Sequence, residues 1–128
     1  MEIRRIEIPL IVLQWSEWFA WGQFLRDARS DPEAIAVPSA PGVYEAKLAD
    51  SEERLTICRT SDLRLQIKQG LVKGKVPHSS GDDIRSKEDT RMVVIRWAET
   101  DRPAAVEEEL HRWHKEAFGK LPRYTDRT

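Results

Sequence analysis

The sequence predicts an α/β (α+β) fold: a small, mainly antiparallel three-stranded sheet flanked by helices, with an added N-terminal arm and helix. Apolar and polar residues alternate in residues 42–48 and 55–58, and residues 92–98 are mostly apolar, which indicates three strands. Apolar residues recur at helical spacing in residues 63–71 and 106–117, which indicates helices. The chain has 128 residues, of which 40% are hydrophobic, and this is enough for one compact core.

The first 36 residues are predicted to form an extension that packs on the main domain, residues 37–128. Residues 6–13 are largely apolar and predict a strand or extended arm. Pro9 favours an edge position for this strand, because proline donates no backbone hydrogen bond. Prolines at positions 32, 38 and 41 predict a loop before the main domain.

A helix is predicted to follow Ser16, which is a good N-cap residue. Its apolar stripe follows helical spacing and consists of Trp18, Trp21, Phe24, Leu25 and Ala28. The stripe is expected to dock on the core. The alternative is an aromatic platform on which nucleic-acid bases stack.

Two strands joined by a polar turn predict a β-hairpin at the start of the main domain. Residues 42–48 alternate between the two faces of the first strand, so Tyr44 and Glu45 lie on opposite faces. Residues 49–53 supply the turn, and residues 55–58 supply the partner strand.

A helix capped by Thr60 or Ser61 and ended by Gly70 or Gly74 is predicted next. Apolar residues recur in it in steps of four, at Leu63, Ile67 and Leu71. This helix and its tail form the one clearly basic region of the chain. The candidate nucleic-acid contacts in and after it are Arg59, Lys68, Lys73, Lys75 and Arg85.

The last third of the main domain is predicted to hold a loop, a strand and a helix. Residues 78–83 are polar and predict a loop that leads into a short turn around Ile84 and Arg85. The apolar run 92–98 predicts a strand in the centre of the sheet. A helix is then predicted from Asp101 to Gly119, with an apolar stripe at Val106, Leu110, Trp113 and Ala117.

The composition restricts the class of protein. Charged residues make up 34% of the chain, but the net charge is only −1, so attraction to nucleic acid requires a local basic patch. The single cysteine, Cys58, excludes an internal disulfide and a cysteine-based zinc cage. The apolar run 8–13 is too short to span a bilayer, and the N-terminus lacks the pattern of a signal peptide. We therefore expect a cytoplasmic protein without membrane association, and the sequence leaves a monomer or a homodimer open.

The acidic run 107–109 opens the last helix. With Val106 facing the core, Glu108 points to solvent, whereas Glu107 and Glu109 flank the buried stripe. Only a flanking carboxylate can be half-buried and still reach a ligand, so the helical geometry leaves Glu107 and Glu109 as candidates. The alternative is an acidic first turn that complements the helix dipole.

Three fragments, in this order, resemble motifs of the GIY-YIG endonuclease superfamily: Pro41-Gly42-Val43-Tyr44, Thr56-Ile57-Cys58-Arg59-Thr60-Ser61-Asp62-Leu63-Arg64, and Glu107-Glu108-Glu109-Leu110. The similarity runs from about residue 37 to the C-terminus, where residues 121–125 resemble a closing motif of the family with Thr125 in place of asparagine. It implies a GIY-YIG-like fold for residues 37–128 and hydrolysis of DNA phosphodiester bonds.

The resemblance also implies roles for individual residues. It implies that Tyr44 helps to activate the attacking water and that Arg64 neutralises charge on the phosphate. It further implies that Glu107 binds Mg²⁺ or another divalent cation. In the second motif Thr56 replaces tyrosine and Cys58 replaces glycine; Thr56 can still hold a water. A weakened endonuclease, an inactive nucleic-acid-binding module and a protein-interaction module therefore all stay open.

The chain has three histidines, at positions 78, 111 and 114. His78 could contact a phosphate or replace the missing proton carrier, and the alternative is a solvated loop residue. His111 and His114 lie on the Glu107 side of the last helix, so the three residues could form a metal cluster. Surface histidines explain them better, because the glutamate inside a histidine pair that zinc proteases use is missing.

Overall fold

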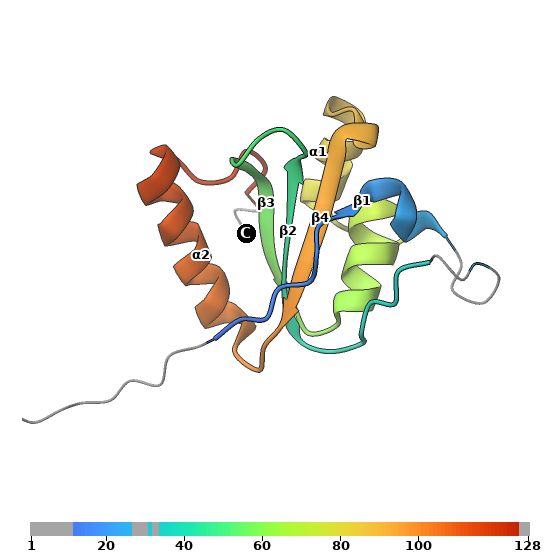
Figure 1. The fold of residues 1–128 in the computed structure, drawn as a ribbon, viewed down its shortest axis with the longest axis horizontal. Coiled ribbons are helices and arrows are strands. Elements are labelled where there is room, and N and C mark those ends of the chain that lie inside the picture. The colour runs from blue at the N-terminus through green and yellow to red at the C-terminus, as the bar shows by residue number, and fades with distance from the viewer. Residues whose placement is uncertain (1–11, 27–30, 32–33, 126–128) are drawn as a thin grey trace, which may run out of the picture.

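A computed structural model of the chain describes residues 12–26, 31 and 34–125. The fold is α+β, with a four-stranded antiparallel sheet and three helices packed against it (Figure 1). The strands are β1 (Phe19–Ala20), β2 (Gly42–Leu48), β3 (Arg54–Thr60) and β4 (Val93–Glu99), in the order β1-β4-β2-β3. No helix in the described part of the chain is both long and apolar enough to cross a membrane.

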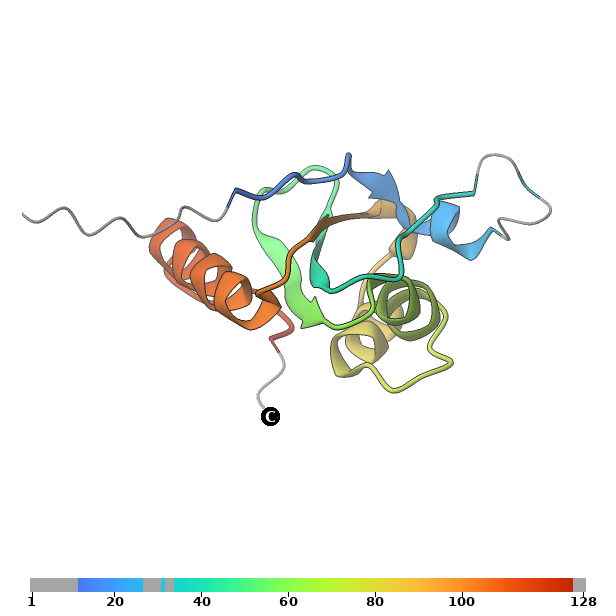
Figure 2. The same ribbon diagram turned by 90° about the horizontal axis from the view of Figure 1, so that it is seen from below.

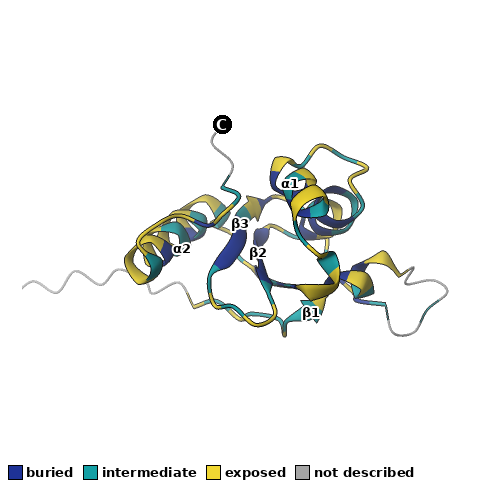
Figure 3. Cartoon of the chain, turned by 90° about the horizontal axis from the view of Figure 1, so that it is seen from above, coloured by how far each residue is buried: buried dark blue, intermediate teal, exposed yellow. Residues whose placement is uncertain are grey.

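The helices cover both faces of the sheet. The three main ones are a π-helix, η2 (Leu65–Val72), and the α-helices α1 (Ser79–Lys87) and α2 (Pro103–Phe118). Two short 3-10 helices, η1 (Trp21–Leu25) and η3 (Thr90–Met92), complete the structure. Seen from below, α2 lies on one side of the strands, and η2 and α1 lie on the other (Figure 2). The strands between them are the most deeply buried part of the molecule (Figure 3).

The predicted hairpin and the predicted alternation in β2 are confirmed. β2 pairs with β3 so that Tyr44 lies opposite Cys58, and β2 pairs with β4 on its other side. Tyr44 and Ala46 face the main core, which also contains the residues predicted for the second helix, Leu63, Ile67 and Leu71. The prediction that β4 is an inner strand is also confirmed, because β4 lies between β1 and β2.

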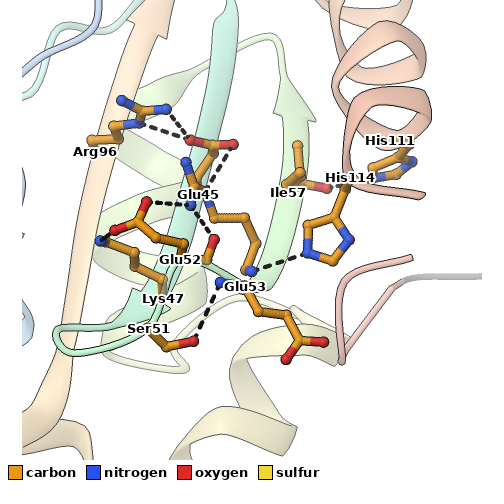
Figure 4. A network of polar contacts seen from close by, with 10 residues as sticks. Glu45, Lys47, Ser51, Glu52, Glu53, Ile57, Arg96, His111 and His114 are labelled. Atoms are coloured by element: carbon orange, nitrogen blue, oxygen red, sulfur yellow. Dashed lines mark hydrogen bonds and ion pairs between the residues drawn. The ribbon is translucent and has the colours of Figure 1, made fainter. Parts of the chain in front are cut away.

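The opposite face of β2 carries a buried charge network. Glu45 is fully buried, and its Oε1 accepts a hydrogen bond of 2.7 Å from Arg96 Nε (Figure 4). Its Oε2 lies 3.4 Å from Arg54 Nε, and among the described residues neither of these two atoms has a hydrogen-bond partner. Lys47 on the same face pairs with Glu52 at 3.1 Å. Burying these charges is tolerated because each has an opposite charge beside it.

The predicted N-terminal helix is wrong, and with it the prediction of three strands. Ser16 caps no helix; instead its backbone N–H donates to Trp97 O, and its hydroxyl accepts from Trp97 N–H. Phe19–Ala20 then pairs with β4 as a fourth strand, and among the described residues of this segment only Trp21–Leu25 is helical. Pairing with an exposed sheet edge outweighs the local helical pattern. The predicted strand at 6–13 lies almost entirely outside the described residues.

The tryptophans of this segment pack inside the molecule. The guanidinium of Arg96 lies 4.0 Å from the ring centre of Trp15 and 4.5 Å from that of Trp18. Arg54 lies 5.1 Å from the Trp18 ring, and Trp21 is buried in the main core. Of the predicted stripe, Trp21 and Phe24 are buried in the main core and Trp18 is half-buried, whereas Leu25 is 53% exposed and Ala28 lies outside the described residues. An extended segment and a short 3-10 helix, and not an α-helix, position these side chains.

The segment predicted as a loop and short turn after residue 77 is a nine-residue helix, α1. His78 is its N-cap, and Nδ1 of His78 accepts the backbone N–H of Gly81 at 2.9 Å. Arg85 in α1 donates to the carbonyls of Gly70 and Leu71 at the end of η2. Histidine is an unusual cap, and α1 carries few apolar residues, so the sequence pattern did not indicate it.

The last helix is confirmed, but its buried face differs from the predicted one. Val106 is buried as expected, whereas Trp113 is 42% exposed and Ala117 is exposed. His114 is fully buried, which corrects its reading as a surface residue. Its Nε2 accepts the backbone N–H of Arg54 at 3.0 Å, and its Nδ1–H donates to Lys120 O at 2.7 Å. A histidine ring can occupy a core position when both of its nitrogens have hydrogen-bond partners, as they do here.

After α2, residues 120–125 form what we call the C-terminal strap. Backbone N–H groups of Arg123 and Tyr124 donate to carbonyls in β3. The carbonyl of Tyr124 accepts hydrogen bonds from the hydroxyls of Thr56 in β3 and Ser80 in α1. The strap thereby ties α1 to the outer strand of the sheet.

Glu88 anchors the strap through Tyr124 Oη at 2.5 Å and Arg123 Nη1 at 2.8 Å. Burial alone would raise the pKa of Glu88, but these hydrogen bonds outweigh it, and the pKa lies below its ordinary 4.5. A lowered carboxyl pKa stabilises the fold above the unfolded-state pKa, and this contribution is lost as the pH falls through the folded-state pKa. We expect Glu88→Gln to lower the free energy of unfolding by about 1–2 kcal/mol at neutral pH.

This difference between wild type and Glu88→Gln should shrink as the pH falls below 4.5. Urea denaturation at neutral pH and at about pH 3 measures it. A difference of the same size at both pH values would contradict the assigned role of the Glu88 charge.

Candidate functional site

A cavity of about 480 Å³ opens beside β3, the last strand of the sheet. It is lined by residues from every layer of the fold. They are Tyr44, Ile57, Cys58, Arg59, Gln66, Pro77, His78, Ser79, Ser80, Glu107 and His111. Polar and titratable side chains predominate in this lining, so the cavity can offer hydrogen bonds and charges to a polar ligand.

Tyr44 and His78 form a hydrogen-bonded pair in the wall of the cavity. Tyr44 Oη and His78 Nε2 are 2.6 Å apart. Because His78 Nδ1 accepts the N–H of Gly81, the neutral ring carries its proton on Nε2, which donates to the phenol oxygen. A hydrogen bond received by that oxygen stabilises negative charge on it. The ring of His78 is also held against η2, since a Cβ added at Gly70 would lie 3.2 Å from His78 Cδ2.

The first turn of α1 and one arginine give the cavity a positive side. Ser79 and Ser80 stand at the N-terminus of α1, where backbone N–H groups and the helix dipole favour an anion. Arg59 is exposed in β3, and no described residue hydrogen-bonds its guanidinium. This side of the cavity suits a phosphate group.

Two side chains of α2 cap the outer edge of β3. The backbone N–H of Arg59 donates to Glu107 Oε2 at 2.9 Å. His111 Nε2 donates to the carbonyl of Ile57 at 3.0 Å. No strand in the described part of the chain pairs with β3 on this side, so these backbone groups depend on the α2 side chains for partners. The two bonds fix Glu107 and His111, one helical turn apart, on the cavity wall.

Cys58 lines the cavity without contributing a reactive group. Burial raises the pKa of its thiol to about 11, although hydrogen bonds from Thr56 and Tyr44 act in the opposite direction. The thiol is therefore protonated at neutral pH, whereas nucleophilic attack and metal binding require the thiolate.

The structure brings together some of the predicted site residues and not others. Tyr44, His78 and Glu107 share the cavity with Arg59, which was predicted as a nucleic-acid contact. Arg64 does not line the cavity; its Nε donates to Val37 O at 2.8 Å, which holds the guanidinium on the preceding loop. The predicted meeting of phenol, guanidinium and carboxylate is therefore corrected, with Arg59 in the place expected for Arg64.

Thr56 also fails to reach the cavity. It is fully buried, and its hydroxyl is bonded to Tyr124 O at 3.0 Å and to Ser80 Oγ at 3.1 Å. The hydroxyl thus holds the C-terminal strap and not a catalytic water.

The remaining predicted nucleic-acid contacts lie outside the cavity lining. The guanidinium of Arg85 is engaged with Gly70 O and with Asp82, so Arg85 is structural. Lys68 lies in η2, and Lys73 and Lys75 follow it. The three lysines can therefore contact a nucleic acid only beside the cavity and not within it.

Sequence reasoning did not single out Gln66, Ser79 and Ser80 of the cavity wall, and it set His111 aside. Gln66 lies in the basic helix, but its amide carries no motif signal. Ser79 was placed in a loop because α1 was not predicted. The spacing of four residues from Glu107 did indicate a shared metal cluster for His111, but the interpretation as a surface histidine was preferred.

The wall fits a divalent cation held by a single carboxylate. Oε2 of Glu107 is taken by Arg59, and Oε1 has no hydrogen-bond partner among the described residues. Mg²⁺ is commonly bound by one or two carboxylates together with waters and substrate phosphates. No group of three or more His, Cys, Asp and Glu residues in the described part of the chain is placed to hold a metal ion.

Comparison of the chain with protein-family models found no match, and neither did comparisons with curated proteins and with solved structures.

Proposed function

We propose that this protein hydrolyses DNA phosphodiester bonds with the help of a bound divalent cation, as a GIY-YIG-like endonuclease. The observation that carries the proposal is that Tyr44, His78, Arg59 and Glu107, from separate parts of the chain, line one open cavity. Cleavage of a phosphodiester by water needs a positioned water, a cationic clamp on the phosphate and a stabilised leaving oxygen.

Tyr44 and His78 act on the attacking water. The Nε2–H of His78 donates to Tyr44 Oη, so this oxygen is fixed on the cavity wall. Tyr44 orients the water, and as the phenolate it accepts the proton that the water loses. His78 stabilises the phenolate charge through the same hydrogen bond.

Arg59 and the N-terminus of α1 bind the phosphate. The guanidinium supplies two parallel donors to phosphate oxygens, and the backbone N–H groups of Ser79 and Ser80 at the N-terminus of α1 supply others. Glu107 would hold the cation through Oε1. When bound, the cation supplies Lewis acidity that stabilises charge on the leaving oxygen.

A plasmid-nicking assay with Mg²⁺ tests the proposal. We expect wild-type protein to convert supercoiled plasmid to nicked circles with Mg²⁺ and not with EDTA. Glu107→Gln should reduce nicking to the level seen with EDTA, because the ligand loses its charge. Glu108→Gln is the matched control: it makes the same change one residue away on an exposed side chain, and nicking should be unaffected.

Equal nicking by wild type and Glu107→Gln would remove Glu107 from the chemistry. Salt-sensitive DNA binding without nicking under any divalent cation would identify an inactive nucleic-acid-binding module instead. Absence of DNA binding together with a salt-resistant protein complex would identify a protein-interaction module.

A further inference from the structure

Glu107 and His111 are each held by one atom and unpartnered at another. Glu107 Oε2 and His111 Nε2 bond the backbone of β3 at Arg59 and Ile57, two residues apart. Among the described residues nothing hydrogen-bonds Glu107 Oε1 or His111 Nδ1. Both side chains line the same cavity. The strand thus fixes two side chains and leaves one lone-pair atom on each.

The hydrogen bond to Ile57 decides which nitrogen of His111 is available. A carbonyl oxygen only accepts, so Nε2 of His111 carries the proton and Nδ1 carries the lone pair. A histidine that binds a metal almost always donates its other ring N–H to a carbonyl or a carboxylate, which sets the tautomer and the ring orientation. His111 has this arrangement before any metal binds.

Glu107 and His111 lie four residues apart on α2, and both line the cavity. Residues four apart lie one above the other on a helix, and paired ligands at this spacing are a known way for one helix to bind a metal. His114, the third member of the cluster considered from the sequence, is excluded because both of its ring nitrogens are bonded in the core.

We propose that Glu107 Oε1 and His111 Nδ1 form a mixed oxygen and nitrogen metal site that prefers a first-row transition-metal ion such as Mn²⁺ over Mg²⁺. The inference rests on the proposed function, because it names the cation class of the same site. An imidazole nitrogen favours first-row transition metals, of which Mn²⁺ binds most weakly, whereas Mg²⁺ prefers oxygen ligands alone. Mn²⁺ is therefore the most demanding test of this preference among these ions. The oxygen-only site implied by the family resemblance would not make this distinction.

Electron paramagnetic resonance of Mn²⁺ added to the full chain tests the inference without requiring activity. We expect wild-type protein to remove the signal of free Mn²⁺ and the bound ion to show spin-echo modulation from a directly coordinated ¹⁴N nucleus. In His111→Gln the amide can still donate to Ile57 O, but no imidazole is present. This variant should lose the ¹⁴N modulation and bind Mn²⁺ at least about tenfold more weakly.

Mg²⁺ competition supplies the second arm. Adding Mg²⁺ to the Mn²⁺-loaded protein displaces the bound Mn²⁺ and thereby measures the affinity for Mg²⁺. In His111→Gln the affinity for Mg²⁺ should stay within about threefold of wild type, and only the affinity for Mn²⁺ should fall. Glu107→Gln should weaken both ions, and Glu108→Gln should weaken neither. Absence of ¹⁴N modulation in the wild-type protein, or equal Mn²⁺ affinity in wild type and His111→Gln, would overturn the inference.

These results separate the inference from the proposed function. Nicking with no ¹⁴N coordination would leave the endonuclease proposal standing and overturn the mixed site. Coordinated ¹⁴N that requires His111, in a protein that nicks no DNA with any cation, would support the metal site and contradict the endonuclease.

Discussion

Tyr44→Phe is expected to lower the turnover number for plasmid nicking about 10²–10⁴-fold, which is the usual contribution of general acid-base assistance. The substitution removes only the phenolic oxygen, which lies 2.6 Å from His78 Nε2 in the cavity wall. Binding of DNA should change little, because Arg59 and the lysines near η2 are untouched. Initial rates at saturating plasmid, together with DNA affinity at fixed salt, separate the two effects.

Tyr124→Phe is the matched control for this substitution. It removes a phenolic hydroxyl that also forms a strong hydrogen bond, to Glu88, but outside the cavity. This variant should lose stability and keep most of its nicking rate. If Tyr44→Phe nicks plasmid within about threefold of wild type, Tyr44 is not the group that handles the water, and the mechanism given above is wrong.

Glu45→Ala is expected to lower the free energy of unfolding by about 3–5 kcal/mol, because it breaks a buried ion pair by removing one partner. Glu45 is fully buried between Arg54 and Arg96, and the side chain of Arg54 is only 5% exposed. Without the carboxylate, two guanidinium groups and Lys47 remain on one face of the sheet with no buried counter-charge. The destabilisation therefore comes mainly from buried positive charges that have lost their counter-charge, and less from the cavity that the smaller side chain leaves.

Urea denaturation of wild type, Glu45→Ala and Glu52→Gln measures this effect. Glu52 pairs with Lys47 in the same network, but its side chain is 78% exposed, so solvent screens it. The midpoint for Glu52→Gln should stay close to that of wild type. A loss below about 1 kcal/mol in Glu45→Ala would show that the network does not depend on its central charge.

The same network explains how the N-terminal segment is held. Arg96 stacks on Trp15 and Trp18, and the Glu45 carboxylate orients Arg96 from the other side. Loss of Glu45 should therefore also loosen residues 12–18. Tryptophan fluorescence recorded during the same unfolding experiment would detect this as an early change.

The local sequence pattern was sufficient to predict the central strand and the buried helix face of the fold. The alternation of residues 42–48 and the stripe of Leu63, Ile67 and Leu71 correspond to β2 and to the buried face of the helical segment that includes η2. Period and face are properties of a short stretch of chain, so they can be read without knowing the partner. Helical geometry left Glu107 and Glu109 as flanking residues of the acidic run, and the family resemblance led to the choice of Glu107. In the structure Glu107 is half-buried and lines the cavity, whereas Glu108 and Glu109 are exposed.

Side-chain partners could not be read in this way. Arg64 occupied the motif position, yet its guanidinium bonds to Val37, and Arg59 reaches the cavity from the edge strand. His114 and Thr56 were given solvent or water contacts, but both are buried and bonded to distant parts of the chain. Each outcome depends on a contact between residues far apart in sequence.

The sequence by itself determined the hairpin, the inner strand β4, the apolar faces of the main core and the helical position of Glu107, because these follow from periodicity along a few residues. Only the tertiary structure decided that residues 19–20 complete a four-stranded sheet, that His78 caps α1 beside Tyr44, and that β3 fixes Glu107 and His111 through its free edge. These arrangements depend on which backbone donors and acceptors lack a partner once the sheet has formed, and that is known only when the strands have been paired.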